Sequence, residues 1–191
     1  MKILKICIIF LLIFLLEKNS KSIEIKNLAS INNETITNID LLQEIKIREI
    51  LENAKITKSD HALILQQMIG DKIKKIETDY NNIKISNTLL IDQKYNQIRN
   101  TKLKEKKVSP SFKKAIIIKI ENNYKWNQLI SLKYKSKLAI NVDEVDEIMK
   151  SKKIPEDKRD QIIKIEKSKK LNIFSKTHFN KIKKKYLVRK H

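Results

Sequence analysis

Apolar residues recur every three or four positions along most of the chain, a spacing that places them on one face of an α-helix. Ile47, Ile50 and Leu51 follow this spacing, and Thr37 or Asn38 precedes them as a capping residue. The pattern predicts helices over residues 38–54, 60–80 and 87–104. A further helical stretch carries Phe112, Ile116 and Ile120. A break at Asn122-Asn123 is expected to separate it from the next helix, which runs from Trp126 to Leu138.

The same spacing identifies the buried faces of the other helices. The helix over residues 60–80 is expected to bury Leu65, Ile69, Ile73, Ile76 and Tyr80, with Gly70 in its interior. Asn141 and Glu144 have the spacing of a capping box, which predicts a short helix ending near residue 150. A long basic helical region is expected to follow Pro155.

Extended segments are expected near both ends of the helical region. Residues 23–36 alternate around an Asn-Asn turn and predict a hairpin, and residues 186–189 predict a terminal strand. A two-stranded ribbon is only marginally stable in water, so the terminal strand is the natural partner of the hairpin. The predicted fold class is therefore mainly α, with a small N-terminal β-hairpin that pairs with a C-terminal strand.

The first 22 residues have the layout of a secretory signal peptide. Lys2 and Lys5 precede an unbroken apolar run over residues 6–16, and Ser20 and Ser22 supply the small residues of a cleavage site. We expect export across a membrane, with no integral membrane segment after cleavage. The expected organisation is then a helical domain over residues 23–150, a linker over 151–157 and a basic C-terminal helix and strand over 158–191.

Basic residues are concentrated towards the end of the sequence. Residues 151–191 hold 15 Lys and Arg against four Asp and Glu, whereas residues 23–150 hold 23 against 17. Such a segment can bind an anionic partner. The excess is almost entirely Lys, together with abundant Ile and Asn, which is also typical of a compositional bias that fills solvated positions. Both interpretations stay open.

Composition argues against most enzyme classes. The chain has one glycine, so a phosphate-binding glycine-rich loop or a dinucleotide fingerprint cannot be built. Cys7 lies in the expected signal peptide, and His61, His178 and His191 show no ligand or catalytic spacing. We expect His61 and His178 to be ordinary surface or half-buried residues. The expectation is a protein with no catalytic residues, no metal and no cofactor.

The order of the elements resembles the N-terminal domain of the SurA family of periplasmic chaperones. The resemblance is carried by the strand and Asn-Asn turn at residues 29–33, by WNQL at 126–129 and by INVDEVDEI at 140–148; the basic helix and strand over 158–189 resembles the segment that closes the family's N-domain. Most members insert parvulin-type prolyl isomerase domains between these parts. Here only residues 149–159 fill that place, and a glycine-rich parvulin domain is not present elsewhere.

The resemblance implies a monomeric, ATP-independent holdase in the periplasm that binds unfolded outer-membrane polypeptides through apolar and aromatic surface. Strands of such polypeptides alternate apolar and polar residues, and their apolar faces are exposed before membrane insertion. The candidate client-binding residues are Tyr95, Phe112, Trp126 and Tyr134, although each also has the spacing of a core residue. The alternative is an exported basic adaptor that binds anionic lipid or nucleic acid through residues 156–191; the chaperone interpretation expects no nucleic-acid partner.

Overall fold

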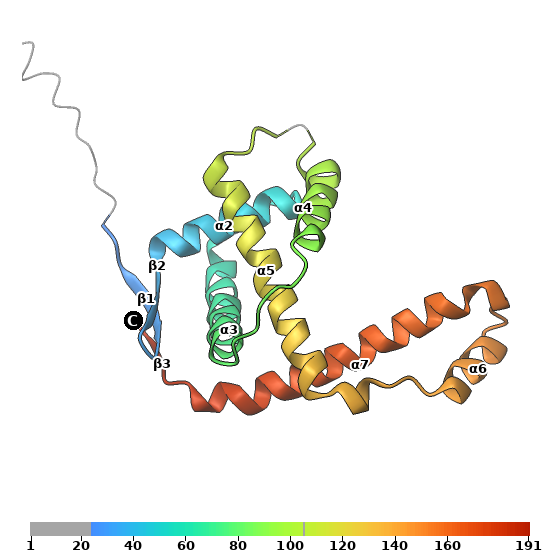
Figure 1. The fold of residues 1–191 in the computed structure, drawn as a ribbon. Helices are drawn as coiled ribbons and strands as arrows, with labels where there is room; N and C mark the ends of the chain where they lie inside the picture. Colours follow the sequence, from blue (N-terminus) through green and yellow to red (C-terminus); the bar gives the residue numbers. More distant parts are fainter. Residues whose placement is uncertain (1–23, 105) are drawn as a thin grey trace, which may run out of the picture.

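The fold is mainly α-helical with one small antiparallel sheet, as Figure 1 shows. This computed structural model describes residues 24–104 and 106–191, so the expected signal peptide lies outside the described residues. The predicted fold class is confirmed.

The sheet joins the two distant ends of the described chain. Its strands are β1 (Asn27–Ile31), β2 (Glu34–Thr37) and β3 (Val188–Lys190), in the order β2-β1-β3. Ile31 lies opposite Glu34 on one side and opposite Val188 on the other. Asn32 adopts a left-handed backbone conformation in the turn, with φ 50°, which asparagine tolerates better than most residues. The expected pairing of the hairpin with a C-terminal strand is therefore confirmed.

Capping residues set the start of several helices. Thr37 and Asp40 form a reciprocal capping box at the first helix, and the Ser109 hydroxyl accepts a hydrogen bond from the Phe112 N–H at another, with Pro110 in its first turn. The helices are α2 (Asn38–Glu52), α3 (His61–Tyr80), α4 (Leu89–Lys102), α5 (Pro110–Lys133), α6 (Val142–Ser151) and α7 (Arg159–Ile182). Short 3-10 turns are η1 (Lys58–Asp60), η2 (Lys135–Leu138), η3 (Glu156–Lys158) and η4 (Lys183–Lys185).

Three local expectations were wrong. The predicted break at Asn122-Asn123 does not occur, because α5 runs continuously through both residues. Tyr80 is 83% exposed rather than buried, because the buried face of the last turn of α3 is formed by Glu77 and Thr78. Asn141 caps α6 by accepting from the Asp143 N–H, and Glu144 does not complete a capping box.

Two groups of buried side chains form the core of the body, and α5 contributes to both. The first lies between the sheet, α3, the second half of α5 and the last turns of α7, and contains Ile31, Trp126 and Ile182. The second lies between α2, α4 and the first half of α5, and contains Ile47 and Ile116. The long α5 therefore holds the two halves of the body together.

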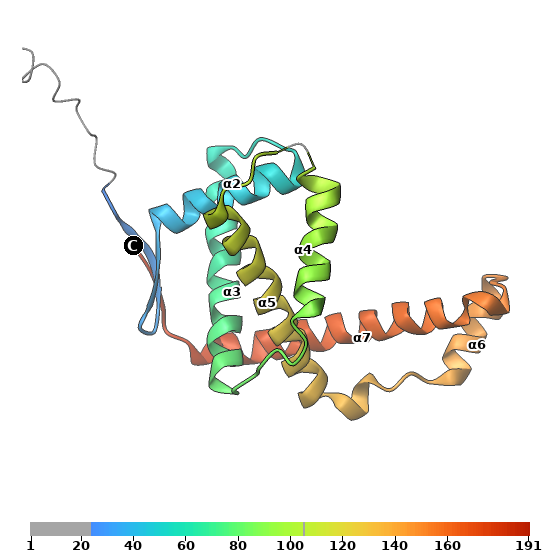
Figure 2. The ribbon, with the colours of Figure 1, turned by 45° about the horizontal axis from the view of Figure 1, so that its top comes forward.

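A helical hairpin extends away from this body, as Figures 1 and 2 show. This arm comprises residues 142–170, which form α6 and the first half of α7. Val145 and Met149 are buried in it, at 1% and 5% exposure. Arg159 closes its tip, with guanidinium nitrogens 2.5 Å from Asp146 Oδ1 and 3.0 Å from Glu156 Oε1.

Candidate functional site

The four aromatic residues predicted to bind clients do not form one exposed surface. Tyr95 and Phe112 are each 7% exposed and belong to the core group around α2, α4 and α5. Trp126 is 3% exposed and lies in the other core group. Tyr134 is half-buried and packs against that group. Trp126 Nε1 also donates a 2.7 Å hydrogen bond to Ser175 Oγ. These aromatic side chains therefore contribute to packing between helices in this structure.

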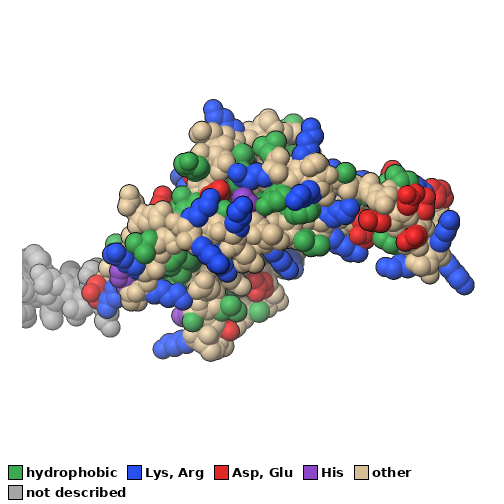
Figure 3. Space-filling view, turned by 90° about the horizontal axis from the view of Figure 1, so that it is seen from below, with side chains coloured by type: hydrophobic (Ala, Val, Ile, Leu, Met, Phe, Trp, Pro, Cys, Tyr) green, Lys and Arg blue, Asp and Glu red, His purple; other side chains and the backbone are tan. Residues whose placement is uncertain are grey.

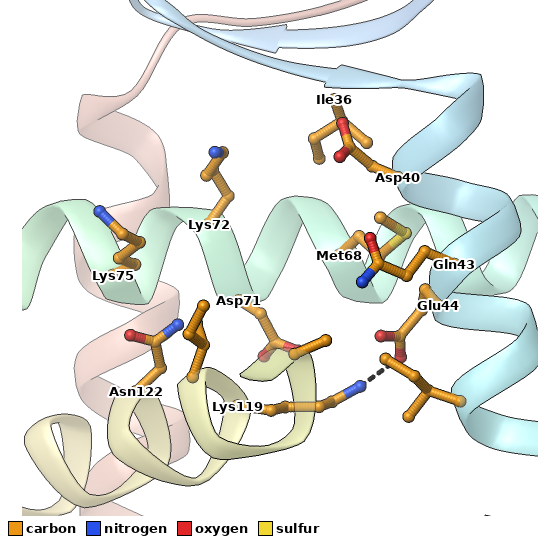
Figure 4. A pocket seen from close by; sticks show the side chains of 13 residues that line it. Ile36, Asp40, Gln43, Glu44, Met68, Asp71, Lys72, Lys75, Lys119 and Asn122 are labelled. Carbon is orange, nitrogen blue, oxygen red and sulfur yellow. Dashed lines mark hydrogen bonds and ion pairs between the residues drawn. The ribbon is translucent and has the colours of Figure 1, made fainter. Parts of the chain in front are cut away.

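An open hollow of about 440 Å³ lies instead between β2, α2, α3 and α5 (Figure 4). Its aliphatic lining comes from Ile36 on β2, Ile47 on α2, Met68 on α3, and Ala115 and Ile118 on α5. Ile118 is 41% exposed, so its side chain is available to a ligand. Ile36 and Ile47 form the buried floor of the hollow at 3% exposure each, so α3 and α5 supply the apolar side chains that solvent reaches.

The charged residues around this hollow are largely neutralised by each other. Lys72 Nζ lies 2.7 Å from Glu34 Oε2, and this hydrogen bond lowers the pKa of Glu34. Lys75 Nζ lies 2.7 Å from Asp79 Oδ2, and that hydrogen bond raises the pKa of Lys75. Because both lysines are paired with carboxylates, the hollow is poorly suited to bind a free anion.

Glu44 on α2 is the centre of a second charged group at the other side of the hollow. Its Oε1 lies 2.6 Å from Arg48 Nε and also pairs with Lys119 Nζ from α5 (Figure 4). The Glu44 side chain is only 12% exposed, so its carboxylate has lost most of its contact with water. The two ion pairs compensate for this desolvation. The pair between Glu44 and Lys119 ties α2 to α5 across the open space.

A further hollow, also of about 440 Å³, lies on the neighbouring side of α5. Its aliphatic lining includes Leu51 from α2, Ile98 from α4 and Ile120 from α5, and Lys119 lines both hollows. A smaller hollow of about 40 Å³ beside Asn122 also includes Lys119. We call the two larger hollows and the α5 ridge at Lys119 between them the α5 groove. Its aliphatic parts are interrupted by amide and charged groups, an arrangement that suits an extended peptide of mixed polarity.

Sequence reasoning did not identify the α5 groove, although one signal was present. Residues 115–118 read Ala-Ile-Ile-Ile, and four consecutive apolar residues on a helix cannot all face the same core. Ile116 is buried at 2% exposure, whereas Ile118 is turned towards the hollow. The ion pair from Glu44 to Lys119 spans 75 residues of sequence and has no local signature.

A buried polar cluster lies apart from the α5 groove, where the last turns of α7 pack on α3 and α5. The expectation of a surface or half-buried His178 was wrong, because it is only 7% exposed. Its Nδ1 is 3.2 Å from Tyr134 Oη, and its Nε2 is 3.9 Å from Glu77 Oε1. Tyr186 Oη donates a 2.7 Å hydrogen bond to Glu77 Oε2. His61, by contrast, is half-buried as expected.

Burial is the main cause of the electrostatic shifts in this cluster. It lowers the pKa of His178, helped by the positive charge of Lys133, while Glu77 acts in the opposite direction. Burial and the hydrogen bond to Glu77 raise the pKa of Tyr186 well above its ordinary value. His178 and Tyr186 come from the C-terminal part and Glu77 from α3, so the cluster fixes the end of the chain to the body.

Two further properties of the described residues and two comparisons with known proteins add limits to these observations. Across residues 24–104 and 106–191, no group of three or more His, Cys, Asp or Glu side chains is arranged to hold a metal ion. None of the helices in that part of the chain combines the length and apolar character needed to cross a membrane. No protein-family model matches the chain, and no curated protein matches it.

Proposed function

We propose that this protein is a periplasmic, ATP-independent holdase that binds unfolded outer-membrane polypeptides and lacks prolyl isomerase activity. The resemblance to the SurA N-domain suggested this function, and the α5 groove supports it. The observation that carries the proposal is the pair of apolar hollows on either side of Lys119, one of which leaves Ile118 open to solvent.

The size of the α5 groove is consistent with weak, sequence-tolerant capture. Covering one aliphatic or aromatic side chain completely contributes about 1.5–3 kcal/mol. Micromolar affinity needs about 8 kcal/mol, in addition to the cost of ordering the client. A client must therefore fill both hollows at once, and a strand with apolar side chains at alternate positions can do so without a fixed sequence.

The short connection between α6 and α7 in the arm supports a chaperone that lacks the inserted isomerase domains. In most members of the family that this chain resembles, isomerase domains stand between the counterparts of α6 and α7. Here α6 ends at Ser151 and the η3 turn begins at Glu156, directly before α7. A proline-peptide assay with catalysis above background would contradict this part of the proposal.

Aggregation suppression of an unfolded outer-membrane polypeptide tests the proposal. Ile118→Asp places a charge in the α5 groove, and we expect it to abolish most of the suppression. Leu63→Asp is the matched control, because Leu63 is 61% exposed on α3 and does not line either hollow. Equal suppression by both variants and by the unmodified chain would refute the assignment of the α5 groove.

The salt dependence of the same assay separates the proposal from the alternative basic adaptor. Suppression based on apolar contact survives high salt, because the hydrophobic effect is not screened. Suppression that depends on the lysines of residues 156–191 is lost at high salt, because dissolved ions then screen exposed charges over distances of a few ångströms. Loss of suppression at high salt would favour the adaptor.

A further inference from the structure

A strip of side chains on α7 is exposed to solvent, and its two isoleucines are left uncovered by the other described residues. Ile165 and Ile173 are 41% and 60% exposed, although both are large and apolar. Lys169 and Lys176 are exposed as well, and the spacing of four, four and three residues puts all four side chains on one side of the helix. We call these four residues the α7 strip.

The surroundings of the α7 strip are strongly basic. Residues 159–191 hold 12 Lys and Arg but only two acids, Asp160 and Glu166. Lys169 Nζ is 2.6 Å from Glu166, whereas Lys176 has no ion pair within the described part of the chain. Figure 3 shows lysines mixed with small hydrophobic patches on the underside of the molecule, where α7 runs, while acidic side chains gather at the far end of the arm.

We infer that the α7 strip docks on the surface of an anionic lipid bilayer. Lysines beside a bilayer are attracted to anionic headgroups, and exposed aliphatic side chains between them can enter the boundary between headgroups and acyl chains. Charge complementarity thus accounts for the lysines, and shallow insertion accounts for exposed Ile165 and Ile173. This inference goes beyond holdase activity and does not depend on it.

Nucleic acid is the less suitable anionic partner for this strip. Binding to single strands relies on aromatic side chains that stack on bases, and duplex recognition favours arginine. The aromatic residues of α7, Phe174 and Phe179, are half-buried against the body. Arg159 is engaged by Asp146 and Glu156. Aliphatic residues among lysines instead match a lipid surface.

The arrangement of the fold lets both surfaces work together. Figures 1 and 2 show α2, which forms one wall of the α5 groove, at the end of the body opposite α7. A bilayer lying against α7 would therefore leave the α5 groove open.

Vesicle co-sedimentation tests the inference. The full chain from residue 23 is mixed with phosphatidylcholine vesicles that contain about one-third phosphatidylglycerol, and in parallel with pure phosphatidylcholine vesicles. Each lysine near such a surface contributes a factor of about five in affinity at moderate salt. Replacing Lys169 and Lys176 by Gln should therefore weaken binding to the anionic vesicles about 25-fold.

Two further variants give the controls. Lys55→Gln with Lys58→Gln removes the same charge from exposed lysines near the end of α2, and we expect a change within about twofold. Ile165→Ser with Ile173→Ser should remove the part of the binding that persists at high salt. These results, with no binding to pure phosphatidylcholine, support the inference.

Three results would overturn it. One is equal binding to charged and uncharged vesicles, and another is equal weakening by the strip pair and the control lysine pair. The third is binding of a single-stranded oligonucleotide that depends on Lys169 and Lys176 while vesicles remain unbound. Aggregation suppression without vesicles should be unchanged in the strip variants, which separates this inference from the proposed holdase.

Discussion

Ile182 gives the sharpest test of how the C-terminal segment contributes to stability. It lies in the last turn of α7 and is 1% exposed. It belongs to the same core group as Ile31 of β1 and Trp126 of α5. Ile182→Ala should therefore destabilise the whole body, even though Ile182 is remote in sequence from these neighbours.

The magnitude follows from the atoms that are removed. The change deletes three buried carbon groups at about 0.8 kcal/mol each, or about 2.4 kcal/mol. The cavity left in a packed core brings the expected loss to about 3–4 kcal/mol. Domains are typically stable by about 5–15 kcal/mol, so this is a large fraction of the total free energy of unfolding.

Urea denaturation followed by far-UV circular dichroism measures the effect. With a denaturant slope of about 2–3 kcal/mol per molar, the midpoint should fall by about 1–2 M. Ile173→Ala is the control, because Ile173 is 60% exposed and its loss should change the free energy by less than about 0.5 kcal/mol. Equal midpoints for the two variants would refute the role of α7 in the core. A chain shortened at residue 150, which loses Ile182 and β3 together, should give the spectrum of an unfolded body.

Three other substitutions test separate features of the structure. Gly70→Ala should raise the free energy of unfolding by up to about 1 kcal/mol in urea titrations, because alanine favours the helix more than glycine does. The added Cβ would meet Phe179 at an ordinary contact distance of 3.4 Å, so no clash opposes this gain. A loss of stability would contradict the prediction. The folded state lowers the pKa of His178 from 6.5, so the unfolded state binds more protons and stability falls as the pH drops below about 6.5. Urea midpoints of His178→Gln should lack this part of the pH dependence, and an unchanged profile would argue against it. Thr37→Ala removes the capping hydroxyl that accepts a hydrogen bond from the Asp40 N–H. The free energy of unfolding, measured by heat or urea, should fall by about 1 kcal/mol. An unchanged value would show that the α2 cap is dispensable.

The sheet could be predicted because its physical requirement is simple. An isolated ribbon is marginal, so the alternating segment at residues 23–36 needed another strand, and the extended residues 186–189 were the natural candidate. The structure places β3 beside β1 with Ile31 opposite Val188. Here a local pattern and a general rule were sufficient to predict a contact between distant parts of the chain.

The continuity of α5 could not be read from local propensity. Two adjacent asparagines are poor helix formers, each costing about 0.5–0.7 kcal/mol relative to alanine. Ile120 and Trp126, on either side of them, are both buried at 7% or less exposure. Packing of the two flanking turns outweighs the small cost at Asn122 and Asn123, so the helix continues.

The candidate binding surface was harder to predict for a geometric reason. An aromatic residue that packs in a core and one that binds a client have the same helical spacing, and Tyr95 and Phe112 proved to be buried. The α5 groove needs side chains from β2 and three helices at once. No single segment contains that information, although exposed Ile118 within an apolar run gave a partial indication.

The closure of the sheet has a consequence for the order of events during biosynthesis. Leu187 N–H donates to Asn32 Oδ1 across 155 residues of sequence. A polypeptide that leaves the ribosome or a translocation channel with its N-terminus first must wait for nearly its whole length before this contact can form. Until then β1 lacks one neighbour and the first core group lacks Ile182, which favours a loosely structured chain and delays final compaction until the last segment has emerged.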